Sequence, residues 1–118
     1  MASQKQQYTI LYGRLSQEDE RAGESNSIQH QRDLLEKFAR DKGFENTLFL
    51  ADDGYSGTNF DRPSWKKIIE MIEAGEVSTL IVKDTSRLGR EYLQVGSYME
   101  IYFPQKNVRF IAVNDGVD

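Results

Sequence analysis

The sequence predicts an α/β fold: a mostly parallel sheet of four to five strands with helices on both faces. Apolar and β-branched runs alternate along the chain with segments whose apolar residues recur at spacings of three and four. The run at residues 79–82, T-L-I-V, is apolar throughout, which is typical of a central parallel strand. This alternation predicts parallel strands that are connected and covered by helices.

The first strand is expected at residues 8–15, where an aromatic and β-branched run leads into Gly13 and Arg14. A helix follows, with Ser27 as its N-cap and Gly43 as the residue that stops it. The side chains that share its inward face are Ile28, Gln31, Leu35, Phe38 and Lys42. His30 falls outside that face, so we expect it to be exposed.

The second strand, residues 47–51, leads into Asp52 and Asp53 and then into a loop rich in glycine and hydroxyl residues. Pro63 suits the first turn of the next helix, which Gly75 ends. The inward residues of that helix are Trp65, Ile68, Ile69 and Ile72. After the third strand, a helix is expected from about residue 88 or 91 to Phe103, where Pro104 terminates it, and a fourth strand at 109–113.

The composition is that of one globular domain. With 118 residues, 38% of them hydrophobic and 29% charged, the chain falls in the ordinary range for such a domain. Residues 1–7 are polar and are expected to form a disordered tail before a domain at 8–118. No apolar signal region and no run of membrane-spanning length occurs, so we expect a cytoplasmic protein without a membrane partner.

Several kinds of site are excluded by residue type. The chain has no cysteine and one histidine, so neither a disulfide framework, nor a thiolate metal site, nor a multi-histidine metal site can form within it. The net charge of −4 argues against strong non-specific binding to nucleic acid. Phosphate chemistry would therefore need arginines that are concentrated in one place.

Three loops leave the carboxyl ends of the predicted strands, and each combines hydroxyl groups with arginine. The residues concerned are Arg14 and Ser16, then Ser56, Thr58 and Arg62, then Ser86, Arg87 and Arg90. Ligands of open α/β sheets bind at the carboxyl ends of the strands, and the guanidinium fork matches phosphate oxygens. Arg62, in a loop, is expected to matter less than Arg14 at a strand end.

Common phosphate motifs are absent, since neither a P-loop nor a G-x-G-x-x-G fingerprint occurs. A magnesium site could be formed by Asp52, Asp53 and Asp84. A serine nucleophile served by arginines is the alternative that the residues favour. Two further readings stay open: a non-catalytic anion-binding or interaction domain of flavodoxin-like architecture, and a serine- or metal-dependent phosphohydrolase.

Several motifs together resemble the catalytic domain of the serine recombinases, the resolvase and invertase enzymes. They are Y-G-R-L-S at 12–16, S-I-Q-H-Q at 27–31, D-D-G-Y-S-G-T at 52–58, R-P at 62–63, S-R-L-G-R at 86–90 and N-D-G-V-D at 114–118. The resemblance covers residues 8–118 and is greatest to the large serine recombinases of the transposon and phage-integrase type. It implies a resolvase-like fold and site-specific cleavage and rejoining of DNA, without a metal or other cofactor.

By position in these motifs, the resemblance implies that Ser16 is the nucleophile that holds a 5′ phosphate as phosphoserine. It implies that Arg14, Arg87 and Arg90 bind the scissile phosphate and stabilise its transition state. Supporting contacts to the substrate would come from Gln31, Ser56 and Arg62.

One position departs from the family pattern. Many members have an aspartate where this chain has Ser86, and neither Ser86 nor Asp84 can be assigned the acidic role from sequence. The resemblance also implies that the chain stops before a long dimerisation helix and a DNA-binding region, and that it would not recombine DNA alone. Its implied partners are specific DNA sites, a second copy in a homodimer, and a tetramer in the synaptic complex.

Overall fold

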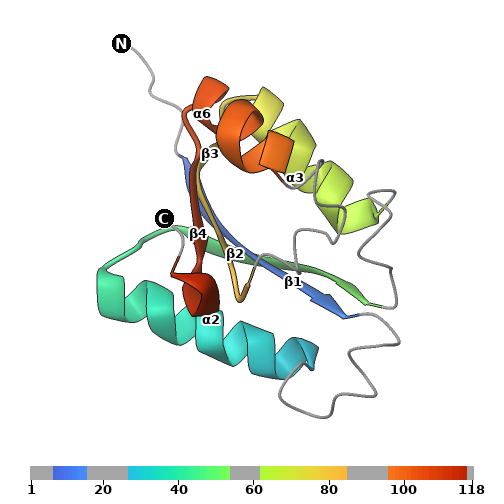
Figure 1. Ribbon diagram of the computed structural model, residues 1–118. Helices are drawn as coiled ribbons and strands as arrows, with labels where there is room; N and C mark the ends of the chain where they lie inside the picture. Colours follow the sequence, from blue (N-terminus) through green and yellow to red (C-terminus); the bar gives the residue numbers. More distant parts are fainter. Residues whose placement is uncertain (1–6, 16–26, 54–61, 85–95, 117–118) are drawn as a thin grey trace.

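A computed structural model describes residues 7–15, 27–53, 62–84 and 96–116. Within these ranges the elements are β1 (Tyr8–Leu15), α2 (Ile28–Lys42), β2 (Thr47–Asp53), α3 (Pro63–Glu73), β3 (Val77–Val82), η2 (Tyr98–Tyr102), α6 (Phe103–Gln105), β4 (Arg109–Ala112) and η3 (Val113–Asp115). Figure 1 shows three layers, with α2 on one face of the sheet and α3 and α6 on the other. The predicted α/β fold is confirmed.

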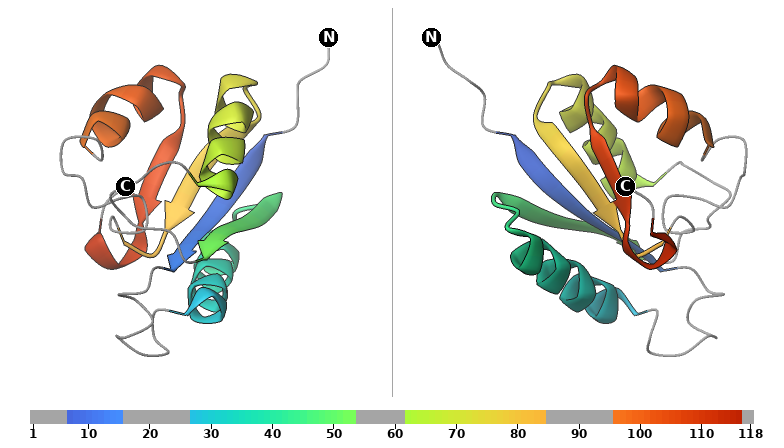
Figure 2. Two further views of the ribbon diagram at one scale, coloured as in Figure 1. Left: turned by 90° about the vertical axis from the view of Figure 1, so that its right-hand side faces the viewer. Right: turned by 60° about the vertical axis from the view of Figure 1, so that its left-hand side comes forward.

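The described strands form one parallel sheet in the order β2-β1-β3-β4. The chain moves from β1 to β2 on one side and then crosses to β3 on the other. The carboxyl ends of β1 and β3 therefore flank the topological switch point, where open α/β sheets bind their ligands. Both views of Figure 2 show the strands running side by side between the two helical layers.

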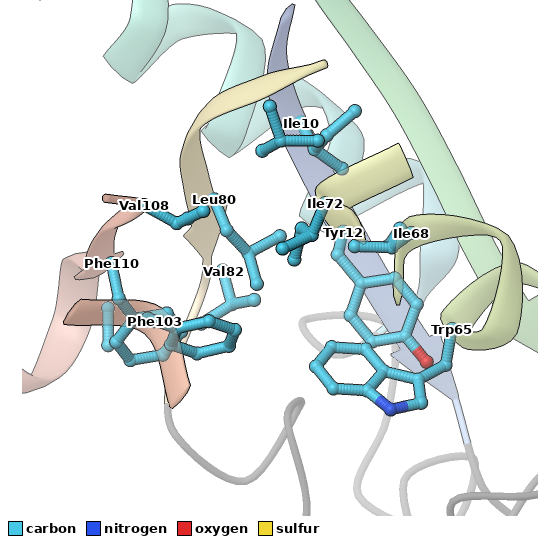
Figure 3. Packing of buried hydrophobic residues seen from close by; sticks show 12 residues of the cluster. Ile10, Tyr12, Trp65, Ile68, Ile72, Leu80, Val82, Phe103, Val108 and Phe110 are labelled. Atoms are coloured by element: carbon cyan, nitrogen blue, oxygen red, sulfur yellow. The ribbon is translucent and has the colours of Figure 1, made fainter. Parts of the chain in front are cut away.

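Two apolar clusters hold the layers together. The larger joins the sheet to α3 and α6 and includes Tyr12, Trp65, Ile68, Phe103 and Phe110. Figure 3 shows Phe103 beside Phe110 and Tyr12 beside Trp65, with Leu80 and Val82 between the two pairs. The smaller joins the sheet to α2 through Leu11, Leu35, Ala39, Ile81 and Ile111. Neighbouring residues of β1 thus face opposite layers, since Tyr12 lies in the first cluster and Leu11 in the second.

Helix α2 begins and ends as predicted. The hydroxyl of Ser27 accepts a hydrogen bond of 3.0 Å from the backbone N–H of His30, and Gly43 adopts a left-handed conformation with φ of 78°. Gln31, Leu35 and Ala39 are its buried residues, whereas His30 and Lys42 are exposed. The exposure of Lys42 corrects its expected place on the inward face: its Nζ lies 5.9 Å from the ring centre of Phe38, so the chain follows that ring while the charged end stays in solvent.

Four boundaries differ from the prediction. Strand β2 continues to Asp53, β3 begins at Val77, and β4 ends at Ala112, where Val113 starts a 3-10 turn. The last helix does not end before Pro104, which lies within its final turn. Because the preceding turn is a π-helix and proline occupies an early position of α6, the missing N–H of Pro104 is not needed there.

The described helices include none that is both long enough and apolar enough to cross a membrane.

Candidate phosphate-binding site at the end of β1

Arg14 occupies the carboxyl end of β1 and is fully buried. It pairs in register with Asp52 of β2, and alternation along β1 puts it on the same face as Tyr12. This is the face that α3 covers. A guanidinium is therefore held inside the protein, two residues before Ser16 in the sequence, rather than extended into solvent.

The side chain of Gln31 fixes the backbone at Arg14. Its Oε1 accepts a hydrogen bond of 3.0 Å from Arg14 N–H, and its Nε2 donates one of 2.9 Å to Arg14 C=O. The register between β1 and β3 ends two residues earlier, at Tyr12 and Val82. Gln31 therefore satisfies the backbone of Arg14 beyond the end of that ladder, as another strand would.

Gly13 makes room for this arrangement. A Cβ atom on Gly13 would lie 3.2 Å from Gln31 Oε1 and 3.2 Å from Cζ of Phe49. Both distances are tighter than ordinary van der Waals contact. A side chain at position 13 would therefore require the amide of Gln31 and the ring of Phe49 to shift by a few tenths of an ångström, and glycine avoids this.

A second buried guanidinium, that of Arg62, lies on the same face of the sheet. Its Nη1 donates a hydrogen bond of 3.1 Å to the hydroxyl of Tyr12, which itself donates one of 2.8 Å to Asp52 Oδ2. The guanidinium carbon also lies 5.8 Å from the ring centre of Tyr12 and 5.6 Å from that of Trp65. Arg62 is the N-cap residue of α3 and is fully buried, so its side chain is enclosed although a loop precedes it.

Asp52 joins this group to the start of α3. Its Oδ1 accepts a hydrogen bond of 2.9 Å from Ser64 N–H, and its Oδ2 accepts one of 3.0 Å from Trp65 N–H. These are N–H groups of the first helical turn, which no residue within the helix can satisfy. Arg62, the N-cap residue, makes no side-chain cap hydrogen bond, so a carboxylate from β2 caps the helix instead.

Burial dominates the electrostatics of the group. It raises the pKa of Tyr12 well above its ordinary value, against the opposing effect of the Arg62 charge. Burial likewise lowers the pKa of Arg62, while Tyr12 and Asp52 act in the opposite direction. Tyr12 therefore remains a neutral hydroxyl that can donate to Asp52 at any ordinary pH.

The predicted site residues divide into two sets. Arg14, Gln31 and Arg62 are described: Gln31 is bound to the backbone of Arg14, and both guanidinium groups lie close enough to Tyr12 to influence its pKa. The other predicted site residues lie outside the described residues: Ser16, Ser56, Arg87 and Arg90. Ser86, at the position that departs from the family pattern, also lies outside them.

Sequence reasoning assigned no role to Tyr12, and it considered Asp52 only as a magnesium ligand with Asp53 and Asp84. Strand alternation could have identified Tyr12, because it stands two residues before Arg14 and so shares its face. No comparable signal identifies Asp52, whose partners lie at positions 12, 64 and 65. Within the described ranges, no group of three or more histidine, aspartate or glutamate side chains could hold a metal ion.

Comparison with known proteins extends over almost the whole chain. A family model described as "Resolvase, N terminal domain" matches residues 9–118. The N-terminal catalytic domain of TP901-1 integrase is 26% identical with a TM-score of 0.83, over 95% of this chain and 81% of that chain. No curated protein matches the chain.

Two further solved structures are similar. A resolvase family site-specific recombinase from Streptococcus pneumoniae is 28% identical with a TM-score of 0.75, over 96% of this chain and 76% of that chain. A serine recombinase from Sulfolobus solfataricus is 25% identical with a TM-score of 0.71, over 93% of this chain and 69% of that chain.

Proposed function

Because this chain belongs to the resolvase family and is the catalytic domain of a serine-type site-specific recombinase, we propose that it cleaves and rejoins DNA through a phosphoserine at Ser16. The observation that carries the proposal is the buried guanidinium of Arg14 at the end of β1. Gln31 fixes its backbone through both peptide groups, and Ser16 follows two residues later. A hydroxyl and a fixed positive charge at a switch point are what attack on a phosphodiester requires.

In the proposed reaction, Ser16 Oγ attacks the phosphorus of the scissile phosphodiester. The bond from phosphorus to the 3′ oxygen breaks, the serine proton ends on that oxygen, and the 5′ phosphate stays on Ser16. Arg14, Arg87 and Arg90 hold the phosphate and neutralise the charge that develops on its oxygens, each for about 3–4 kcal/mol. Rejoining is the reverse step, with a 3′ hydroxyl of another strand as the attacking group.

Ser56, Arg62 and Gln31 complete the proposed site as supporting residues. For Gln31 the support is indirect, since both polar atoms of its amide are engaged with Arg14. DNA is the substrate of the family, and we propose a homodimer that pairs into a tetramer at synapsis, in the bacterial cytoplasm.

The test is a search for nucleotide covalently bound to Ser16. The protein as its gene encodes it is incubated with a plasmid that carries the DNA surrounding that gene, then denatured and digested with nuclease and trypsin. Cleavage after Arg14 and Arg21 releases the peptide L-S-Q-E-D-E-R, in which Ser16 is the one hydroxyl residue. We expect this peptide to carry a nucleotide phosphate, detected by mass spectrometry.

Ser16→Ala should abolish the adduct, whereas Ser97→Ala, at an exposed serine outside the site, should leave it unchanged. A peptide 15–21 that is never modified, or an adduct that persists in Ser16→Ala, would contradict the proposal and favour a non-catalytic domain.

A further inference from the structure

We propose that Tyr12 and Asp52 are positioning residues that set the orientation of the Arg62 guanidinium for the reaction at Ser16. The inference rests on the proposed function, because it assumes that Arg62 supports phosphate binding. It goes beyond that function by assigning a role to two residues that would not themselves touch DNA.

The orientation of Arg62 is restricted by a hydrogen bond and by two aromatic rings. One of its terminal nitrogens donates to the hydroxyl of Tyr12 at 3.1 Å, and its guanidinium carbon lies 5.8 Å and 5.6 Å from the ring centres of Tyr12 and Trp65. The ring centres of Tyr12 and Trp65 are 5.6 Å apart and the ring planes are inclined at 54°, so the two rings border the cation on different sides. Figure 3 shows these two rings together, with the hydroxyl of Tyr12 close to the indole of Trp65. A guanidinium that donates a hydrogen bond and is bordered by two aromatic rings has few rotamers open to it.

The hydroxyl of Tyr12 is itself fixed. It accepts from Arg62 and donates to Asp52 Oδ2 at 2.8 Å, and the donated bond determines the direction in which its lone pairs point. Burial keeps this hydroxyl protonated, as the raised pKa of Tyr12 indicates. Tyr12 therefore presents a permanent acceptor to Arg62.

Asp52 is held by the same helix that begins after Arg62. Its two oxygens accept from Ser64 and Trp65 N–H, and Ser64 Oγ donates 2.7 Å to the carbonyl of Ala51. The hydrogen bonds thus run from the first turn of α3 to Asp52, on to Tyr12 and back to Arg62 at the N-cap of α3. These hydrogen bonds fix the orientation of the guanidinium relative to β1, to β2 and to the start of α3.

Stability alone does not account for this arrangement. Removing a guanidinium from water is unfavourable, and well-packed apolar residues commonly stabilise a core as well as a buried ion group does. The lowered pKa of Arg62 reflects this unfavourable burial. A preorganised donor, in contrast, gains its catalytic value from being held in place before the charge develops.

The experiment is a double-mutant cycle on the rate of adduct formation, with protein in excess over the plasmid described above. Tyr12→Phe should slow the reaction by about 10- to 100-fold in the unaltered protein, as expected for a lost hydrogen bond to a charged group. In the Arg62→Ala background, the same change should slow it by less than about 3-fold, because no guanidinium remains to be oriented. Tyr102→Phe removes a hydroxyl near the protein surface, bound to Glu73, and should leave the rate unchanged.

Equal effects of Tyr12→Phe in both backgrounds would overturn the inference, since a structural role does not depend on Arg62. Asp52→Asn is tested in the same two backgrounds, so that the inference can still be overturned if Tyr12→Phe does not fold. Equal effects of Asp52→Asn on the rate in both backgrounds would likewise overturn it. Folding of every variant is checked by circular dichroism at the assay temperature. An unaltered protein that forms no adduct removes the proposed function and the inference together, whereas an adduct with no coupling removes the inference alone.

Discussion

Gln31 binds Arg14 through both backbone groups of one residue, with distances of 3.0 Å to N–H and 2.9 Å to C=O. A side chain from α2 thereby completes the hydrogen bonding of β1 at the point where the chain approaches Ser16. The amide is fully buried, so water does not replace it.

Gln31→Leu should therefore destabilise the protein by about 2–6 kcal/mol, because two buried backbone groups would each lose a partner at about 1–3 kcal/mol. Adduct formation at Ser16 should fall as well, since the strand end loses its fixed position. Urea unfolding measures the first effect and the rate of adduct formation the second. Gln29→Leu is the control, because its amide is exposed and donates to Asp33 on the same helix. A Gln31→Leu protein as stable as this control would contradict the role of the amide.

Gly13→Ala should destabilise the protein by about 1–3 kcal/mol, the usual effect of overpacking. The added methyl would meet Gln31 Oε1 and the ring of Phe49, each at 3.2 Å, and Gln31 Oε1 is held there by its hydrogen bond from Arg14 N–H. Gly96→Ala is the matched control, since nothing lies within 4 Å of a Cβ there and the residue is helical. That change should be neutral or stabilising by up to about 1 kcal/mol. Thermal unfolding of the two variants makes the comparison, and similar shifts in both would argue against a close approach at Gly13.

Asp52→Ala should loosen the start of α3 more than its end. The change removes the acceptor of Ser64 and Trp65 N–H and leaves the hydroxyl of Tyr12 without its acceptor, a loss of about 2–4 kcal/mol. Hydrogen exchange should show faster exchange at the amides of residues 64 and 65. Asp33→Ala, at an exposed aspartate of α2, should leave those amides unchanged. Unchanged protection of both amides in Asp52→Ala would show that the carboxylate does not cap the helix.

The sequence predicted the order of the strands and helices better than it predicted the contacts among them. The alternation of apolar runs and helical spacing sufficed for the strand and helix order, and it placed Arg14 at the carboxyl end of β1. The sequence shows a glycine at position 13, but it does not indicate that Gln31 and Phe49 approach the backbone there. Gln31 reaches Arg14 only because α2 packs on β1 in one particular register, and local pattern contains no information about that register.

Asp52 illustrates the same limit. At the end of an apolar run it reads as an ordinary turn residue, and its role depends on residues 40 positions before it and 12 and 13 after it. The predicted end of the last helix was wrong for a different reason. Proline usually ends a helix, yet a π-turn and an early position in α6 remove the need for its N–H.

The contact between Tyr102 and Glu73 should make stability depend on pH on the acid side. The hydroxyl of Tyr102 donates to Glu73, and with Lys106 Nζ at 3.3 Å it lowers the pKa of that carboxyl below its usual 4.5. A carboxylate with a lowered pKa stabilises the folded state above its unfolded pKa, and this contribution disappears as pH falls through the lowered value. Tyr102→Phe should therefore be less stable than the unaltered protein near pH 7, and the difference should shrink below about pH 4. Urea midpoints across this range test it, with Tyr8→Phe as the control at a tyrosine that is 37% exposed. A difference that stays constant down to the lowest pH would mean that Tyr102 acts by packing, not through the charge of Glu73.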